Sequence, residues 1–339
     1  MATENSLLLN STTLGNQEDS KWFYVLAWPL MMLYACWAAL KVWPYRLWRW
    51  AMCRPSDGAD EEEWKEYQKR WWLGPRNALW LFDSHWLGEM VRNGVTTSEA
   101  LDGINAVPVL SRKGELNTWG GWWVRFWLNQ PDGQAVRNRL RITFREILNE
   151  LCRLWESRQA GQKIHVLSLA SGSAQATIEA MAVFLAAYSD ARGNIELHLV
   201  DRSGSSLLRA THLAKVRGVD SHVFIHTQDV KSFLAAQPDG SWDMVEMVGF
   251  LDYRKWKSAV EICGAIRRVL KAGGMFISAH IGPSIWSFVV RWVINWPLLL
   301  RRPISAYRRI LLWAGFAESE VKILDEPHKI HPVGVCRKR

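Results

Sequence analysis

The residues best suited to chemistry follow three apolar, strand-like runs in the second half of the chain. The small residues Ala170-Ser171-Gly172-Ser173-Ala174 follow the run IHVLSL, Asp201 closes the next run, and Asp229 follows the third. A turn without bulky side chains lets the backbone approach a ligand at a helix N-terminus, and the acid after the next strand can accept hydrogen bonds from both ribose hydroxyls. An acid one strand further on can receive an adenine amino group. The pattern therefore predicts a nucleotide site.

Further polar residues stand where the fourth and fifth strand-like runs end. Glu246, Asp252, Tyr253 and His280 could each remove a proton from a substrate at this edge. Of these, Asp252, Tyr253 and His280 are our candidate catalytic residues. Each position also has a structural interpretation, in which Glu246 is paired inside the sheet, Asp252 caps the following helix and His280 is a satisfied buried histidine.

The elements that must position these residues alternate between strand and helix from residue 163 onward, which is typical of βαβ units and a parallel sheet. The expected strands are 164–169, 195–200, 223–226, 243–248 and 275–279, with a late hairpin near 318–324 and 331–336. The expected helices are 135–156, 175–188, 205–217 and 256–270. We therefore expect an α/β, Rossmann-like doubly wound sheet, mostly parallel with a C-terminal antiparallel hairpin.

Five motifs on these elements resemble the class I S-adenosylmethionine (SAM)-dependent methyltransferases. They are LSLASGSAQAT (167–177), LVDRS (199–203), TQDV (227–230), WDMVEMVGFLDY (242–253) and RRVLKAGGMFISAH (267–280). The resemblance covers roughly residues 163–339. It implies that SAM is the cofactor, with the methionine part held by the first turn, the ribose by the strand-two acid and the adenine by the acid after strand three. The residues that match these roles are Ala170, Gly172, Ser173, Asp201, Asp229 and Val230.

The first turn departs from the pattern of this family, which is acid-x-Gly-x-Gly-x-Gly. Ser168 stands in place of the acid, and Ala170 and Ala174 stand in place of the outer glycines. Because alanine is disfavoured at positive φ, we expect negative φ at both alanines.

The N-terminal third carries a membrane pattern. Residues 1–20 are polar and predict a flexible tail, whereas Trp22 to Leu40 contain no charge. As a helix this segment would span about 28 Å, close to the ~30 Å hydrocarbon core of a bilayer. We predict a transmembrane helix at 21–43, kinked by Pro29, with an interfacial or buried helix as the alternative. Glu18 and Asp19 argue against a cleaved signal peptide.

Tryptophan is concentrated in the same third, which holds 15 of the 22 Trp residues within the first 130 positions. The run KVWPYRLWRW (41–50) alternates aromatic and basic residues, as at the headgroup level of a membrane. By the positive-inside rule, the chain after Lys41 lies on the cytoplasmic side of a single-pass protein. Residues 44–134 form a Trp-rich juxtamembrane or helical region, and 135–339 form the SAM-dependent methyltransferase-like domain. The cluster at 119–127 could contact lipid, line an apolar pocket or pack on the following domain.

The segment 284–303 is strongly apolar but is interrupted by Arg291 and Pro297. Each half is too short to span a bilayer. It is either a helix that covers the sheet or an interfacial helix or substrate lid, and its tryptophans favour contact with a membrane interface.

The charge balance and the Cys and His positions indicate which classes of binding partner to expect. The net charge is +9, from 42 Lys+Arg against 33 Asp+Glu, but many basic residues lie beside Trp-rich apolar runs, so a bilayer explains them better than nucleic acid does. The five scattered Cys indicate neither disulfides nor a zinc module, and His328 and His331 have no nearby carboxylate in the sequence, so we predict no metal site.

Together these features predict a membrane-anchored SAM-dependent methyltransferase acting on a hydrophobic small molecule or lipid-like acceptor. Two alternatives stay open. One is an NAD(P)-dependent oxidoreductase, which also uses a small-residue turn and a strand-two acid. The other is a catalytically inactive, methyltransferase-like membrane scaffold.

Overall fold

The computed structural model describes residues 85–93, 97–159, 161–284, 296 and 299–339, with isolated positions at 29, 33, 36, 37, 40 and 44. The predicted tail at 1–20, nearly all of the predicted membrane helix at 21–43 and most of 284–303 lie outside the described residues. Among the helices that are described, none is long and apolar enough to cross a bilayer. The chain divides into two compact units, Met1–Gln134 with Ser284–Leu298, and Ala135–Pro283 with Leu299–Arg339.

The described part of the first unit is helical. It contains α4 (Trp86–Asn93), α5 (Ser98–Arg112) and α6 (Trp119–Leu128), and α7 (Pro131–Ser157) begins within it. Helix α6 carries the tryptophan cluster, and its N-cap Thr118 accepts a hydrogen bond from Gly121 N at 3.1 Å. Trp127 is 1% exposed, whereas Trp119 at the start of the helix is 67% exposed. Much of the cluster is therefore core of this unit.

The second unit is built on a seven-stranded sheet with the order β3-β2-β1-β4-β5-β7-β6. The strands are β1 (Ile164–Leu169), β2 (Ile195–Asp201), β3 (Val223–Thr227), β4 (Trp242–Met247), β5 (Leu270–Ala279), β6 (Val321–Leu324) and β7 (Val333–Arg337). The pairs among β1 to β5 are parallel, and β7 is antiparallel to both β5 and β6. The predicted α/β class, with a mostly parallel sheet and an antiparallel C-terminal hairpin, is confirmed.

Strand β5 begins five residues earlier than the sequence predicts. The Lys271-Ala272-Gly273-Gly274 stretch, expected as a turn, is part of the strand. Gly273 N donates to Lys338 O at 2.6 Å, and Lys338 N donates to Gly274 O at 3.0 Å. The C-terminus of the chain supplies these two hydrogen bonds, which no local propensity reveals.

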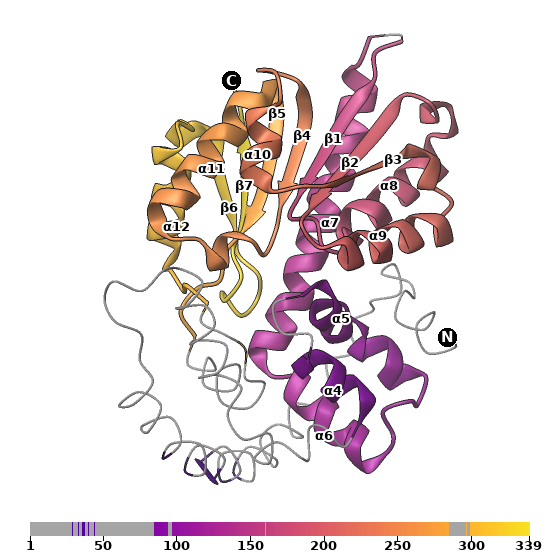
Figure 1. Ribbon diagram of the computed structural model, residues 1–339, viewed down its shortest axis with the longest axis vertical. Coiled ribbons are helices and arrows are strands. Elements are labelled where there is room, and N and C mark those ends of the chain that lie inside the picture. The colour runs from indigo at the N-terminus through magenta and orange to yellow at the C-terminus, as the bar shows by residue number, and fades with distance from the viewer. Residues whose placement is uncertain are drawn as a thin grey trace. The chain divides into compact units, whose positions relative to one another are not determined.

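Helices cover both faces of this sheet (Figure 1). They are α8 (Gln175–Ala187), α9 (Gly204–Val216), α10 (Val230–Ala235), α11 (Trp256–Val269) and α12 (Ile304–Trp313), with short 3-10 turns at Ser189–Ala191, Asp220–His222, Leu251–Tyr253 and Glu318–Glu320. Leu167 and Leu169 of β1 share one hydrophobic cluster with α10, α11 and α12. Because alternate strand residues point to opposite faces, Val166 of β1 faces the other layer. The two-sided burial explains why four of the six residues in each of β1 and β4 are apolar.

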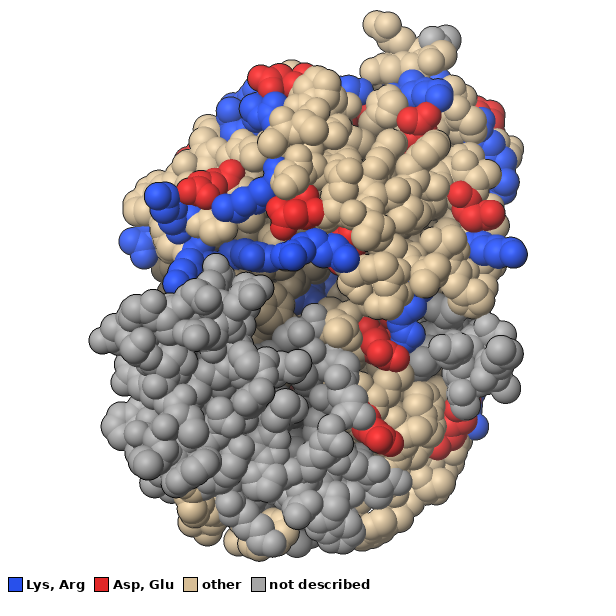
Figure 2. Space-filling view, viewed as in Figure 1, with Lys and Arg blue, Asp and Glu red and all other residues tan. Residues whose placement is uncertain are grey.

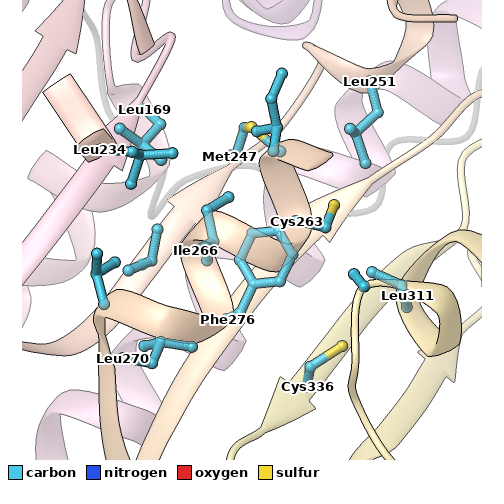
Figure 3. Close-up of a cluster of buried hydrophobic side chains, with 14 of the residues drawn as sticks. Leu169, Leu234, Met247, Leu251, Cys263, Ile266, Leu270, Phe276, Leu311 and Cys336 are labelled. Atoms are coloured by element: carbon cyan, nitrogen blue, oxygen red, sulfur yellow. The ribbon is translucent and has the colours of Figure 1, made fainter. Parts of the chain in front are cut away.

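The largest described core cluster lies between the sheet and α10, α11 and α12 (Figure 3). Phe276, Ile266 and Leu311 are fully buried there, and burial of each such side chain contributes about 1.5–3 kcal/mol. Cys263 and Cys336 are also buried as free thiols, and burial raises the pKa of Cys263 to about 12. These cysteines therefore pack as small apolar residues.

Tyr307 of α12 packs closely against strand β7 of the C-terminal hairpin. Tyr307 of α12 is fully buried, and its hydroxyl lies 2.6 Å from Ser278 Oγ of β5. The strand residue paired with Ser278 is Gly334, and a Cβ added there would lie 2.5 Å from Tyr307 Oη and 3.1 Å from its Cζ. Only glycine leaves room for the tyrosine ring over β7.

We expect Gly334→Ala to lower the free energy of unfolding by about 1–3 kcal/mol, because the new methyl group must displace a fully buried ring. Gly204→Ala is the matched control, since a Cβ there meets nothing within 4 Å. Urea denaturation of both variants measures the difference. Equal stability of the two variants would show that Tyr307 does not restrict this position.

Candidate functional site

The predicted nucleotide residues meet at the carboxyl ends of β1, β2 and β3. The turn 170–174 follows β1, Asp201 is the last residue of β2, and Asp229 follows β3 as the N-cap of α10. The strands are parallel neighbours, so their ends open on the same edge of the sheet. This edge is where open α/β sheets bind ligands.

The turn after β1 adopts a left-handed backbone at three of its residues. The φ angles are +48° at Ala170, +55° at Gly172 and +49° at Ala174. Our expectation of negative φ at the two alanines is therefore wrong. Each alanine in this region costs roughly 1–2 kcal/mol, so tertiary contacts must hold the turn against its own preference.

Hydrogen bonds from the turn to β2 hold the turn in this conformation. Gly172 N donates to Asp201 Oδ2 at 2.9 Å, and Ser171 N donates to Val200 O at 3.1 Å. Asp201 Oδ1 accepts from Ser203 N at 2.8 Å. Each carboxylate oxygen has a second lone pair, so Asp201 can hold the turn and still accept a hydrogen bond from a ligand hydroxyl group.

Asp229 and Val230 play different parts. Asp229 Oδ1 accepts from Lys231 N at 2.9 Å and from Ser232 N at 3.4 Å, which caps α10. The residue is half-buried, and the remaining lone pairs of its carboxylate can accept from a ligand amino group. Val230 is 4% exposed and its side chain belongs to the core, which leaves its backbone as the part able to face a ligand.

Two buried hydroxyl groups beside the turn give a structural test for a cofactor. Ser171 Oγ in the turn and Thr177 Oγ1 in the first turns of α8 are buried, and neither makes a hydrogen bond within the described residues. Unsatisfied buried hydroxyls are rare because each carries a desolvation penalty. With the acids Asp201 and Asp229, they form a donor and acceptor set that fits a nucleoside-containing cofactor such as SAM.

The acid missing from the first turn is supplied by the adjacent strand. Ser168 Oγ donates to Glu246 Oε2, and these two residues are register partners on β1 and β4. Glu246 Oε1 accepts from Val248 N at 3.0 Å. Burial raises the pKa of Glu246 to about 7, although both hydrogen bonds and Arg139 oppose this shift. A carboxyl group therefore stands beside the position where the family has one, but on a different strand.

The candidate catalytic residues Asp252 and His280 are brought together. His280 Nδ1 lies 2.8 Å from Asp252 Oδ1, and the same oxygen accepts from Ile281 N at 2.7 Å. On the other side of the ring, Arg302 Nη1 lies 3.2 Å from His280 Nε2. Since Arg302 can only donate, Nε2 accepts and the ring proton is on Nδ1. His280 is thus fully buried between the Asp252 carboxylate and the Arg302 guanidinium, although Nδ1 does not meet hydrogen-bond geometry with a described residue.

Asp252 is held as a carboxylate by its neighbours and does not cap the following helix, whose N-cap is Lys255. Burial by itself raises its pKa, but the contact with His280 and the charge of Arg139 outweigh burial, so the pKa of Asp252 lies below its usual value. Tyr253, the next residue, is half-buried on the same 3-10 turn. The catalytic role of all three residues stays a prediction.

Sequence reasoning missed the buried bases around Asp252. Arg139 of α7 is 6% exposed, and its Nη1 lies 3.8 Å from Asp252 Oδ2 and 3.3 Å from His331 Nδ1. Burial lowers the pKa of both Arg139 and His331. Arg139 and His331 come from opposite ends of the domain, and neither lies in a motif. A basic residue among the inward positions of an amphipathic helix was the available clue to Arg139.

No family model and no curated protein sequence matches the chain. Solved structures match it. A possible exported protein of Bordetella parapertussis has 14% identity and a TM-score of 0.56, over 91% of this chain and 96% of that one. The magnesium protoporphyrin IX methyltransferase of Synechocystis PCC 6803, solved with bound SAM, has 15% identity and a TM-score of 0.43, over 69% and 97%.

A third structure, the DszA carbon methyltransferase, has 16% identity and a TM-score of 0.47, over 59% of this chain and 53% of its own. These values describe likeness of fold. Solved methyltransferases are thus among the structures that this chain resembles, at low identity and over part of its length.

The buried Glu246 predicts a distinct pH dependence of stability. Its pKa is about 7 in the folded chain and about 4.5 when exposed, so the folded state keeps a proton that the unfolded state releases. The contribution of Glu246 to the free energy of unfolding is therefore fully present below pH ~4.5 and is lost as pH rises to about 7. At ~1.4 kcal/mol per pH unit, the loss is roughly 3 kcal/mol.

Glutamine cannot ionise, so Glu246→Gln avoids this loss. We therefore expect the free energy of unfolding of the variant minus that of the parent to grow by roughly 2–3 kcal/mol as pH rises from 5 to 8. The exposed Glu261→Gln is the control and should follow the parent. Urea denaturation across this pH range gives the difference. A constant difference would mean that Glu246 titrates normally.

Proposed function

We propose that the second unit is a SAM-dependent methyltransferase domain. The observation that carries this proposal is the meeting of the left-handed turn 170–174, Asp201 and Asp229 at one edge of a sheet that ends in an antiparallel hairpin. A nicotinamide-binding sheet needs neither the acid after β3 nor this hairpin.

In this proposal each part of the edge holds a different part of the cofactor. The turn, with Ala170, Gly172 and Ser173, lies against the methionine portion, Asp201 accepts from the ribose hydroxyls, and Asp229 with the backbone of Val230 receives the adenine. Bound SAM would supply an electrophilic methyl group for in-line displacement. The carboxyl group of Glu246 lies beside the turn, where it suits the positively charged amino group of the methionine portion.

The acceptor would approach from the ends of β4 and β5. Asp252 and His280 lie against each other there, and they contact Arg139 and Arg302 respectively. Tyr253 is the half-buried member of the predicted set. For an oxygen or nitrogen acceptor a proton must leave during the reaction, and Tyr253 is the side chain of the three that is open to solvent. Asp252 and His280 then act by holding the loop that carries it.

We further propose that the acceptor is a hydrophobic small molecule or lipid-like, and that the chain is anchored in a bilayer by 21–43 with the domain on its cytoplasmic side. The support is the charge-free segment 22–40 and the crowding of tryptophan and basic residues after it. On the face of the domain seen in Figure 2, Lys and Arg alternate with Asp and Glu. That mixture suits a soluble face better than a nucleic-acid groove.

Calorimetric titration tests the cofactor assignment. We expect the full-length protein in detergent to bind SAM, with Asp201→Ala and Asp229→Ala each weakening binding by about tenfold or more, because each removes a charged acceptor worth about 1.5–3 kcal/mol. Asp190→Ala, an exposed acid on a turn elsewhere, is the control and should bind as the parent does.

The outcomes separate the alternatives. A folded sample that binds no SAM would overturn the methyltransferase proposal. Binding of NADH instead would favour the oxidoreductase, and failure to bind either would favour the scaffold. A loss of SAM binding in the Asp201 variant alone, with a changed circular dichroism spectrum, would indicate collapse of the turn rather than a lost ligand contact.

Membrane fractionation tests the anchor. We expect the expressed full chain to stay with membranes through alkaline carbonate extraction. Leu26→Arg with Met32→Arg should release it, because each charge near the centre of a spanning helix costs about 2.5–3.5 kcal/mol. Ser6→Arg with Thr12→Arg adds the same charge to the predicted tail and should change nothing. Extraction of the parent chain by carbonate would contradict the anchor.

A further inference from the structure

A second group of ligand-type side chains lies toward the amino ends of β1 and β2, away from the nucleotide edge. His165 is the second residue of β1, and Glu196 and His198 are the second and fourth residues of β2. The strand register pairs His165 with Glu196 and Leu167 with His198. Paired residues on parallel neighbours, and residues two apart on one strand, share a face of the sheet. The three side chains therefore project together.

We propose that His165 Nδ1, Glu196 Oε2 and His198 Nε2 form a binding site for a divalent transition-metal ion of the zinc type. His165 Nδ1 and His198 Nε2 lie 3.3 Å and 3.7 Å from Glu196 Oε2, and ligand atoms of all three residues lie within 4.8 Å of one another. Bonds of about 2.0–2.1 Å in a tetrahedral shell place neighbouring ligand atoms about 3.3–3.4 Å apart. A small closure of the three side chains reaches that geometry, and the fourth position is left for water.

The ring of His198 is held in place as metal-binding imidazoles are. Its Nδ1 lies 2.9 Å from His226 Nε2, and its ring stacks on Phe224 at 4.9 Å and meets the edge of Trp242 at the same distance. In the tautomer that carries its proton on Nδ1, the contact with His226 leaves the Nε2 lone pair available to an ion beside the Glu196 carboxylate.

An ion pair already made by Glu196 leaves the proposed ligand atom available. Lys163 Nζ contacts Oε1 at 2.6 Å, whereas the two histidines approach Oε2. The ion pair between Lys163 and Glu196 does not by itself explain why two imidazoles lie beside Oε2. The side chains of His165, Glu196 and His198 are 33%, 21% and 19% exposed, so an ion can reach them from solvent.

The donor set also predicts which ions bind. Two imidazole nitrogens and one carboxylate oxygen suit zinc, cobalt or nickel, whereas magnesium and calcium prefer all-oxygen shells. The ion would join β1 to β2, the two strands whose other ends carry the turn and Asp201. Binding to the folded state alone would raise the thermal midpoint of unfolding.

The test uses the full-length protein, freed of metal with a chelator, and zinc(II) and cobalt(II) salts as probes. We expect one zinc ion per chain, a rise in the thermal midpoint, and intense visible absorption of the cobalt form, as four-coordinate cobalt shows. His165→Gln and Glu196→Gln should each weaken zinc binding about tenfold or more. Magnesium should give no saturable shift.

The control is His212→Gln, which changes an exposed histidine on α9 and should keep parental zinc affinity. Circular dichroism and metal-free thermal midpoints establish that the ligand variants are folded. Absence of stoichiometric zinc in the parent, or equal zinc affinity in all three variants, would overturn the proposal. Because the readout is metal binding and not methyl transfer, it is independent of the outcome for SAM.

Discussion

The hydrogen bond from Gly172 N to the Asp201 carboxylate is the interaction on which the nucleotide edge depends. The chain leaves β1 through a left-handed bend at Ala170 and Ala174, and alanine resists that backbone by roughly 1–2 kcal/mol per residue. Ala174 N donates to Ser171 O at 2.8 Å within the turn, and Asp201 and the carbonyl of Val200 tie the turn to β2. The same carboxylate thus builds the turn and, in the proposed function, binds the ribose. A site made in this way is formed before the cofactor arrives, so little ordering is required on binding.

The ends of β4 and β5 depend on a different balance, among charged and polar groups that are largely removed from water. Arg139, Asp252, His280 and Arg302 come from α7, the 3-10 turn after β4, the end of β5 and the segment before α12. Removing one member of such a set leaves its partner charged and buried, which costs about 3–5 kcal/mol. This network ties four distant segments to one point. His280, which the sequence offers either as a base or as a buried structural histidine, is fully buried in this network.

The succession of strands and helices along the chain and the placement of acids after β2 and β3 could be predicted from the sequence, because they follow from alternating patterns and from the direction of parallel strands. Pairings between distant segments could not. Ser168 is visibly out of pattern, but its partner Glu246 lies 78 residues away on a strand whose register one sequence does not reveal. The negative φ expected for Ala170 rested on local preference, and tertiary hydrogen bonds overcame it. The early start of β5 has the same cause, since its partner is the C-terminus.

The register between β1 and β2 connects both ends of the sheet. The pairing that sets His165 beside Glu196 also sets Leu169 beside Val200, and so brings the backbone of the turn to the Val200 carbonyl. A slip of β2 by one residue would turn Glu196 and His198 to the face opposite His165 and move Asp201 away from Gly172. Asp201 lies three positions after His198, about 10 Å along the strand. Any group that fastens the amino ends of these strands therefore also restrains the register that the nucleotide turn requires.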